Sequence, residues 1–145
     1  MVQIRPVTKH NLEEVLSLRV SDDQAGYVST TAESLAQAYI YQETAFPFAV
    51  YSDGEIVGFI MMGYYEEKKY YTLWKLLIDR NCQRRGYGKA VLLLGIQFLK
   101  KRFQANEIYT GVIPGNSVAK GLYESLGFTE TGVFENNMLE MRLSC

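Results

Sequence analysis

The chain has few of the residues that build metal sites and disulfide frameworks. Its 145 residues include only two cysteines, Cys82 and Cys145, and one histidine, His10. Two cysteines make no disulfide framework, and with a single histidine they leave a zinc site short of ligands. We therefore expect no metal site and a reducing compartment.

Long apolar runs and an excess of one charge are also missing. No apolar run reaches the roughly 18 residues that a membrane span needs, and the first residues lack the apolar core of a signal peptide. The formal net charge is −1 at pH 7, which provides no general attraction to nucleic acid. We expect a cytoplasmic protein with one domain, residues 1–145, that binds neither membranes nor nucleic acid.

The hydrophobic pattern predicts a succession of strands and helices in an α+β arrangement. Strands are expected at 2–7, 46–51, 56–65, 70–78 and 107–113, with two more between 128 and 143. Helices are expected at 8–19, 30–42, 86–101 and 116–126. The order β-α-α-β-β-β-α-β-α-β-β predicts a mixed, mostly antiparallel sheet with helices on both faces.

Local signals refine this outline. Thr8 is expected to cap the first helix, and Thr30 with Glu33 forms a capping-box pattern. Asp53-Gly54 predicts a tight hairpin turn. Apolar spacing assigns a core-facing stripe to three helices, and the third helix is expected to be largely buried. The stripe residues are Leu12, Val15, Leu16 and Arg19; Leu35, Ala38, Tyr39 and Gln42; and Val118, Ala119, Leu122, Tyr123 and Leu126.

A glycine-rich segment follows the apolar strand that ends at Ile78. Gly86 and Gly88 let the backbone approach a ligand closely, and the helix that begins there directs free N–H groups to the same point. The helix dipole favours an anion, and Arg84, Arg85 and Lys89 add positive charge. The spacing does not fit the nucleotide P-loop, which has four residues between its glycines, and Val91 stands where the dinucleotide fingerprint has its third glycine. We predict a phosphate or pyrophosphate site.

Two motifs resemble those of one enzyme superfamily. Gln83-x-x-Gly86-x-Gly88 resembles the acetyl-CoA pyrophosphate loop of the GNAT N-acetyltransferases. The residues from Asn116 to Phe128 resemble the Asn-x-x-Ala-x-x-Leu-Tyr-Glu-x-x-Gly-Phe segment of the same superfamily. The size of the chain and its strand Trp74-Lys75-Leu76-Leu77-Ile78-Asp79 resemble bacterial spermine/spermidine acetyltransferases.

This resemblance implies acetyl-CoA as co-substrate and direct transfer to a primary amine. It places the pantetheine amides and the thioester carbonyl against the backbone of Leu76, Leu77 and Ile78, and it places Asn116 at the pantetheine arm. Tyr123 would face the sulfur and act as the general acid, which suits a phenol of pKa near 10. The pyrophosphate would be wrapped by Arg84, Arg85, Gly86, Tyr87, Gly88 and Lys89. Asn116 is equally a helix N-cap, and Tyr123 equally a core tyrosine.

The acceptor side is less specific. Asp22 and Glu33 are candidate contacts for a cationic amine, although they also suit loop solvation and helix capping. Trp74 is the third candidate, and it aligns with a glutamate of several polyamine-acetylating relatives. Either another acid then acts through water, or the amine arrives neutral, so the general base stays open.

Several alternatives follow from this gap. The amine is expected to be a small polyamine, but an amino acid, an antibiotic or a protein N-terminus fits the same motifs. A CoA-binding sensor without turnover is a further hypothesis. A homodimer through the final strands is expected, because apolar surface is predicted at Phe134, Met138, Leu139 and Met141.

Overall fold

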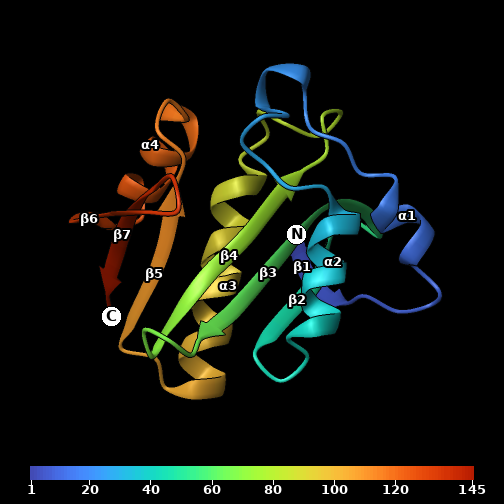
Figure 1. The fold of residues 1–145 in the computed structure, drawn as a ribbon. Coiled ribbons are helices and arrows are strands. Elements are labelled where there is room, and N and C mark those ends of the chain that lie inside the picture. Colours follow the sequence, from blue (N-terminus) through green and yellow to red (C-terminus); the bar gives the residue numbers. More distant parts are fainter.

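The computed structural model describes residues 1–145. It contains a seven-stranded sheet with helices on both faces (Figure 1). The strands are β1 (Val2–Pro6), β2 (Ala45–Ser52), β3 (Glu55–Tyr65), β4 (Tyr70–Ile78), β5 (Glu107–Val112), β6 (Thr129–Glu135) and β7 (Met138–Ser144). The helices are α1 (Leu12–Leu16), α2 (Thr31–Ile40), α3 (Tyr87–Phe103) and α4 (Ser117–Ser125), with a 3₁₀ turn η1 at Asp22–Gln24. The predicted order of elements and the α+β class are confirmed.

The sheet order is β1-β2-β3-β4-β5-β7-β6. Every neighbouring pair is antiparallel except β4 and β5, which are parallel. A parallel pair needs a crossover connection, and α3 supplies it. This connection places the glycine-rich loop directly after β4, at the start of α3.

Hydrophobic cores lie on the two faces of the sheet. Phe59 and Met61 of β3 pack with Val15 of α1 on one face. Ile60 of β3 packs with Leu92 of α3 on the other face. Because successive strand residues point to opposite faces, the apolar run of β3 fills both cores and fixes its central place in the sheet.

Two local predictions are confirmed in detail. The Thr30 hydroxyl accepts a hydrogen bond from the Glu33 N–H at 3.1 Å, and the Glu33 carboxylate accepts one from the Thr30 N–H at 3.3 Å. Asp53 and Gly54 both have positive φ, 51° and 84°, as the tight turn between β2 and β3 requires.

The start of the first helix was predicted wrongly. Thr8 does not cap it: α1 begins after Asn11, whose side chain accepts a hydrogen bond from the Thr8 N–H at 2.7 Å. The same side chain donates to the Pro6 carbonyl and to the Tyr51 hydroxyl, so Asn11 is occupied in fixing the turn after β1. The helix ends at Leu16, and Arg19 is exposed beyond it.

Some apolar residues of the helices face solvent against expectation. Tyr39 of α2 is 70% exposed and Val118 of α4 is 67% exposed. Leu93 is exposed as well, so α3 buries one broad face and not its whole surface. Helical spacing identifies a stripe but not its edges, and these residues lie at the edges. No helix combines the length and the apolar character that crossing a membrane would require.

Candidate active site

An opening between β4 and β5 defines the candidate site. The two strands pair only at Tyr71 with Ile108 and at Thr72 with Tyr109, and beyond these positions β4 pairs with β3 alone. The Thr110 hydroxyl donates to the Leu73 carbonyl at 3.0 Å and closes the narrow end of the opening. The rest of this edge of β4 has backbone groups without strand partners, and it can pair with the amides of an extended ligand.

A β-bulge interrupts the pairing of β4 with β3, on the other side of β4 from the opening. Met62 pairs with Leu73 and Met61 pairs with Lys75, so Trp74 is the extra residue. After the bulge the Leu77 carbonyl faces Gly58 of β3, lying 2.5 Å from where a Cβ on Gly58 would stand.

Backbone groups alternate along a strand, so the two neighbours of Leu77 direct theirs to the open side. These neighbours are Leu76 and Ile78, which supports the predicted backbone contacts there. The part predicted for Leu77 stays a prediction.

The glycine-rich loop has the geometry of an anion site. Gly86 is the N-cap of α3 and has a φ of 76°, and Arg84 is also left-handed, with a φ of 64°. The first turn of α3 leaves N–H groups free beside the exposed Arg84, Arg85 and Lys89. No acidic residue lies in this turn. A pyrophosphate therefore fits the donors and the charges that gather here.

Side chains beneath the loop hold it in place. The Gln83 side chain donates to the Ile78 carbonyl at 3.1 Å and to the Gln24 side chain at 3.2 Å. The Tyr87 hydroxyl accepts a hydrogen bond from Ser52 of β2 at 3.2 Å. The Tyr87 side chain is thus directed toward β2, and its N–H is the group available to a phosphate.

Tyr123 lies in the core beside the narrow end of the opening. Its side chain is buried, and its ring packs edge-to-face on Phe128 with centroids 5.4 Å apart. Burial raises the pKa of the Tyr123 hydroxyl, against a smaller lowering by the neighbouring Thr110 hydroxyl. Tyr123 is therefore protonated at neutral pH, as a proton donor must be. Its role as the acid stays a prediction.

Asn116 is the N-cap of α4. Its side-chain oxygen accepts a hydrogen bond from the Ala119 N–H at 3.3 Å. The capping role is confirmed, and the amide nitrogen has no protein acceptor. That nitrogen supports the predicted contact with the pantetheine arm, which stays a prediction.

The three predicted acceptor residues lie in different settings. Asp22 is exposed in η1, and the Glu33 carboxylate is engaged by Thr30 at the start of α2. Trp74 stands at the bulge, where Tyr41 packs edge-to-face against it at 6.0 Å. Glu33 and Trp74 lie on the same face of the sheet, and Lys75 is close to both of them. The structure shows no contact between Asp22 and either residue.

Lys75 is a residue that sequence reasoning missed. Its ammonium donates to the Ser29 hydroxyl at 2.8 Å, and burial lowers the pKa of Lys75 while Glu33 opposes this shift. A lysine next to a tryptophan in an apolar strand gave no sequence signal. Only the bulge, which changes the alternation of side chains in β4, brings it to the α2 face.

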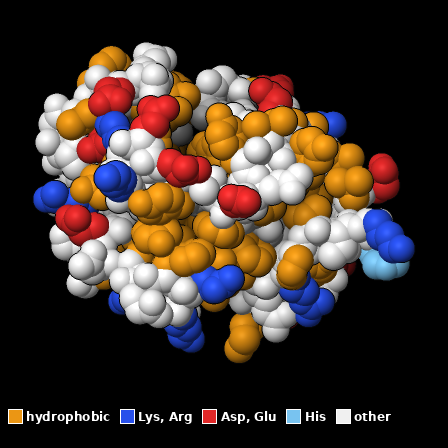
Figure 2. All heavy atoms as spheres, turned by 60° about the horizontal axis from the view of Figure 1, so that its bottom comes forward, with side chains coloured by type: hydrophobic (Ala, Val, Ile, Leu, Met, Phe, Trp, Pro, Cys, Tyr) orange, Lys and Arg blue, Asp and Glu red, His pale blue; other side chains and the backbone are white.

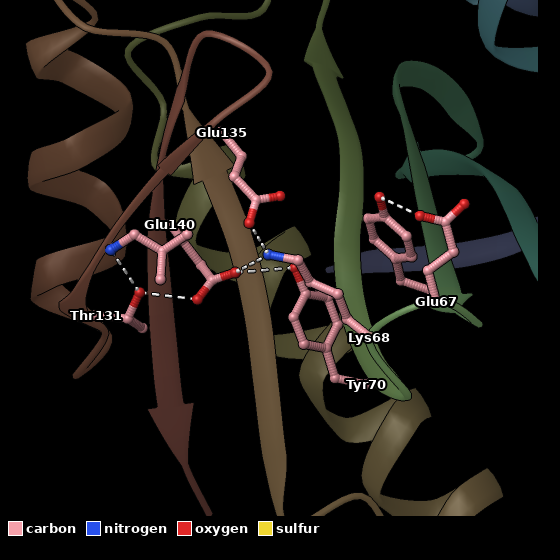
Figure 3. Close-up of polar contacts among 8 residues, drawn as sticks. Glu67, Lys68, Tyr70, Thr131, Glu135 and Glu140 are labelled. Carbon is pink, nitrogen blue, oxygen red and sulfur yellow. Dashed lines mark hydrogen bonds and ion pairs between the residues drawn. The ribbon is translucent and has the colours of Figure 1, made fainter.

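A charged network lies at the opposite end of β4, away from the loop (Figure 3). Glu140 of β7 accepts hydrogen bonds from Tyr70, Lys68 and Thr131 at 3.1, 3.3 and 2.8 Å. Burial opposes its ionisation, but these donors outweigh burial and lower the pKa of Glu140. Burial and Glu140 together raise the pKa of Tyr70 to about 12. Glu140 is therefore a poor base.

A shallow cleft lies beyond the C-terminal end of α2. It has a volume of about 450 Å³ and is lined by Tyr39, Ile40, Tyr41, Gln42, Glu43, Thr44 and Glu66. Figure 2 shows this end of the molecule, where hydrophobic side chains gather with carboxylates among them. Tyr41 connects the cleft to Trp74 through their ring contact. Aromatic faces beside carboxylates suit an alkyl ammonium group.

Comparisons with known proteins agree with this geometry. The model of the acetyltransferase (GNAT) family matches residues 12–128. Spermine/spermidine N(1)-acetyltransferase of Bacillus subtilis is 31% identical over 94% of this chain and 93% of its own length. The alanine N-acetyltransferase for ribosomal protein bS18 of Escherichia coli is 29% identical over 86% of both chains.

Solved structures share the fold. Spermidine N-acetyltransferase from Vibrio cholerae in complex with CoA and spermine superposes with a TM-score of 0.78 and 18% identity, over 99% of this chain and 95% of that one. An aminoglycoside acetyltransferase in complex with coenzyme A superposes with a TM-score of 0.81 and 18% identity, over the same shares.

Proposed function

The chain belongs to the GNAT acetyltransferase family, and we propose that it acetylates a primary amine of a small polyamine such as spermidine or spermine. It is an N-acetyltransferase that uses acetyl-CoA. The amine class is our proposal. The observation that carries it is the path from Trp74 through Tyr41 to the cleft that contains Glu43 and Glu66.

The path has the chemistry of an extended polycation. One amine would lie near the bulge at Trp74, beside the edge of β4 where we place the thioester. The methylene chain would run along the tyrosine ring, and a distal ammonium would meet Glu43 and Glu66. Cation–π contact and two carboxylates favour such a group over a neutral tail.

The cofactor side of the proposal follows the same geometry. The pyrophosphate lies on the loop between Arg84 and Lys89, and the pantetheine arm pairs with the open edge of β4 at Leu76 and Ile78. Asn116 contacts this arm. The Tyr123 hydroxyl gives its proton to the departing sulfur. Each role is supported by the positions described above.

The polyamine specificity is tested with a panel of amines. Release of free CoA is measured with spermidine, spermine, putrescine, lysine, an aminoglycoside and a peptide N-terminus. We expect the highest kcat/KM with spermidine or spermine. A higher value for the peptide N-terminus would instead favour the activity of the bS18-modifying relative, which is the second candidate.

A pair of variants separates the cleft from general surface charge. Glu66→Gln removes a carboxylate of the cleft, whereas Glu67→Gln removes the exposed neighbour that does not line it. We expect Glu66→Gln to raise the KM for spermine about threefold, as the loss of one partly exposed charge contact implies. Glu67→Gln should leave the KM within the error of the assay. Equal KM values for both variants would place the polycation elsewhere.

A homodimer through the β6–β7 hairpin is a further part of this proposal, with a cytoplasmic location. Val133, Phe134 and Met138 are exposed there, with Phe134 at 56%. Met141, which was predicted to add to this surface, is fully buried in the core, so that prediction was wrong. Its place on β7 opposite Thr110 of β5 turns it toward α4. The mass in solution measured by light scattering tests the dimer.

A further inference from the structure

Lys75 has an unusual position for a lysine. It stands on β4 directly after the bulge, and its neighbour Leu76 directs backbone groups into the opening where we place the thioester. Its side chain extends toward α2, where the ammonium meets the Ser29 hydroxyl at 2.8 Å. The same ammonium lies 6.0 Å from the centre of the Trp74 ring.

The segment that contains Ser29 crosses the opening between β4 and β5. Gln24 at its start contacts Gln83 of the loop at 3.2 Å. In its middle, the Tyr27 hydroxyl lies 3.2 Å from where a Cβ on Gly115, after β5, would stand. Ser29, at the end of the segment, accepts the hydrogen bond from Lys75. Lys75 is therefore sheltered beneath this segment, on the face from which the amine would approach.

Three carboxylates of the neighbouring segments accept hydrogen bonds. The Asp79 carboxylate accepts hydrogen bonds from the N–H groups of Arg19 and Asn81, at 2.9 and 3.1 Å. The Glu33 carboxylate is held by Thr30, and the Asp23 carboxylate by Ser21 at 2.6 Å. A group that takes a proton from an ammonium needs a free lone pair within reach. Each of these carboxylates is held by a neighbouring group, and none of them forms a hydrogen bond with Lys75 or Trp74.

We propose that Lys75 is the general base of the transfer, taking a proton from the acceptor ammonium. The inference rests on the proposed function, because it uses the place assigned there to the thioester along Leu76 and Ile78. The position of Lys75 after the bulge brings its nitrogen to the face of the sheet that carries Trp74 and α2, where we place the amine.

The protons balance as follows. The neutral Lys75 amine removes one proton from the acceptor ammonium and later releases it to solvent. The acceptor nitrogen then forms the N–C bond with the acetyl carbon, and the C–S bond breaks. The sulfur takes a proton from Tyr123, and the new amide nitrogen returns its remaining surplus proton to Tyr123. The products are the acetylated amine, CoA with a free thiol, and one proton.

The surroundings of Lys75 favour its neutral form. Burial lowers the pKa of Lys75, and the one charged group that opposes this is Glu33 of α2. Met61 of β3, opposite Lys75, and Ser29 carry no ionisable group. Glu33 also offers the released proton a way to solvent, because it is exposed.

Three variants test the inference. Lys75→Arg keeps a donor to Ser29 but is always charged and cannot act as a base. Lys75→Gln removes the base altogether. Lys100→Arg makes the same exchange at an exposed lysine in the last turn of α3 and serves as the control. Each is assayed with whichever amine the wild type acetylates fastest, so a wrong amine class does not affect the result.

We expect kcat to fall about a hundredfold in Lys75→Arg and Lys75→Gln, as the loss of a general base implies. Acetyl-CoA binding and the circular dichroism spectrum should match the wild type, and Lys100→Arg should match it in every respect. A second substrate, a fluorinated analogue of the same amine with a lower pKa, separates catalysis from packing. The analogue loses its proton more readily and depends less on the base. The fall in kcat caused by Lys75→Gln should therefore be smaller with the analogue than with the original amine.

The pH profile gives a direct reading. In the wild type, the acid limb of kcat should stay at the same pH with both amines, because Lys75 sets it. In Lys75→Arg the limb should instead move with the pKa of the amine, which must lose its proton without the base. Labelled lysine methylene groups, followed by NMR, should show Lys75 titrating below the other lysines. The inference is overturned if Lys75→Arg keeps wild-type kcat and its acid limb, or if Lys75 titrates with the exposed lysines. A wild type that acetylates no polyamine but another amine overturns only the proposed substrate.

Discussion

The Thr110 hydroxyl of β5 donates a hydrogen bond to the Leu73 carbonyl of β4 at 3.0 Å. This is the last bridge between the two strands before they separate, and Tyr123 lies beside Thr110. A ligand that pairs with the open edge of β4 therefore ends near the Tyr123 hydroxyl. This bridge therefore places the buried phenol beside the narrow end of the open strand edge.

Replacing Tyr123 with phenylalanine should reduce turnover without affecting cofactor binding. The variant keeps the ring that packs on Phe128 but has no proton for the sulfur. We expect kcat to fall about a hundredfold, with acetyl-CoA affinity within about twofold of the wild type by calorimetry. The pKa of Tyr123 is raised, so the wild type should show no loss of its acid up to about pH 10. If Tyr123→Phe kept the turnover of the wild type across this pH range, Tyr123 would not be the general acid.

Gly86 and Gly121 form a matched pair for testing the loop. Gly86 has a φ of 76°, where a side chain is strained although space is free, whereas Gly121 lies exposed in α4 without positive φ. Gly86→Ala should destabilise the protein by about 1–2 kcal/mol and weaken acetyl-CoA binding about tenfold. Gly121→Ala should stabilise it by about 0.5–1 kcal/mol. Thermal unfolding and calorimetry measure both effects. Equal acetyl-CoA affinity in the two variants would show that the loop does not bind the cofactor.

The exposed arginines of the loop should act on the pyrophosphate alone. Arg85→Gln should raise the KM for acetyl-CoA about tenfold, since a charge-assisted contact to phosphate contributes about 1.5 kcal/mol. The KM for S-acetyl-N-acetylcysteamine, a thioester without pyrophosphate, should not change. Lys100→Gln, at the far end of α3, is the control with the same loss of charge. A similar rise with both thioesters would show that Arg85 acts elsewhere.

Patterns close together in the sequence predicted much of this structure. The Thr30–Glu33 capping box and the Asp53-Gly54 turn were predicted correctly because each depends on four or fewer successive residues. The loop at Gly86 was placed correctly for the same reason, since strand, loop and helix follow one another.

Features that depend on contacts between distant residues could not be predicted from local patterns. Lys75 reaches the acceptor face because of a bulge at Trp74, and Ser29, its partner, is 46 residues away. The prediction of Thr8 as the cap missed Asn11, because the contact between Asn11 and Tyr51 of β2 has no local signal. The burial of Met141 likewise depends on the pairing of β7 with β5.

Glu140 should make the stability of the protein fall at acid pH. Its carboxylate accepts three side-chain hydrogen bonds that join β7 to β6 and to the start of β4. Because its pKa is lower in the folded protein than in the unfolded chain, its contribution is complete above the ordinary carboxyl pKa. The contribution is lost as the pH falls through the folded value.

Glu140→Gln measures this contribution. At pH 7 the variant should lose about 2 kcal/mol of unfolding free energy, because an amide is a weaker acceptor than a charged carboxylate. The difference from the wild type should shrink steadily below about pH 4, where the wild-type carboxylate takes up its proton. Glu124→Gln, at an exposed position of α4, should stay within about 0.5 kcal/mol of the wild type throughout. Denaturant unfolding at a series of pH values gives these energies, and a difference that is constant from neutral to acid pH would mean that packing, not charge, makes Glu140 matter.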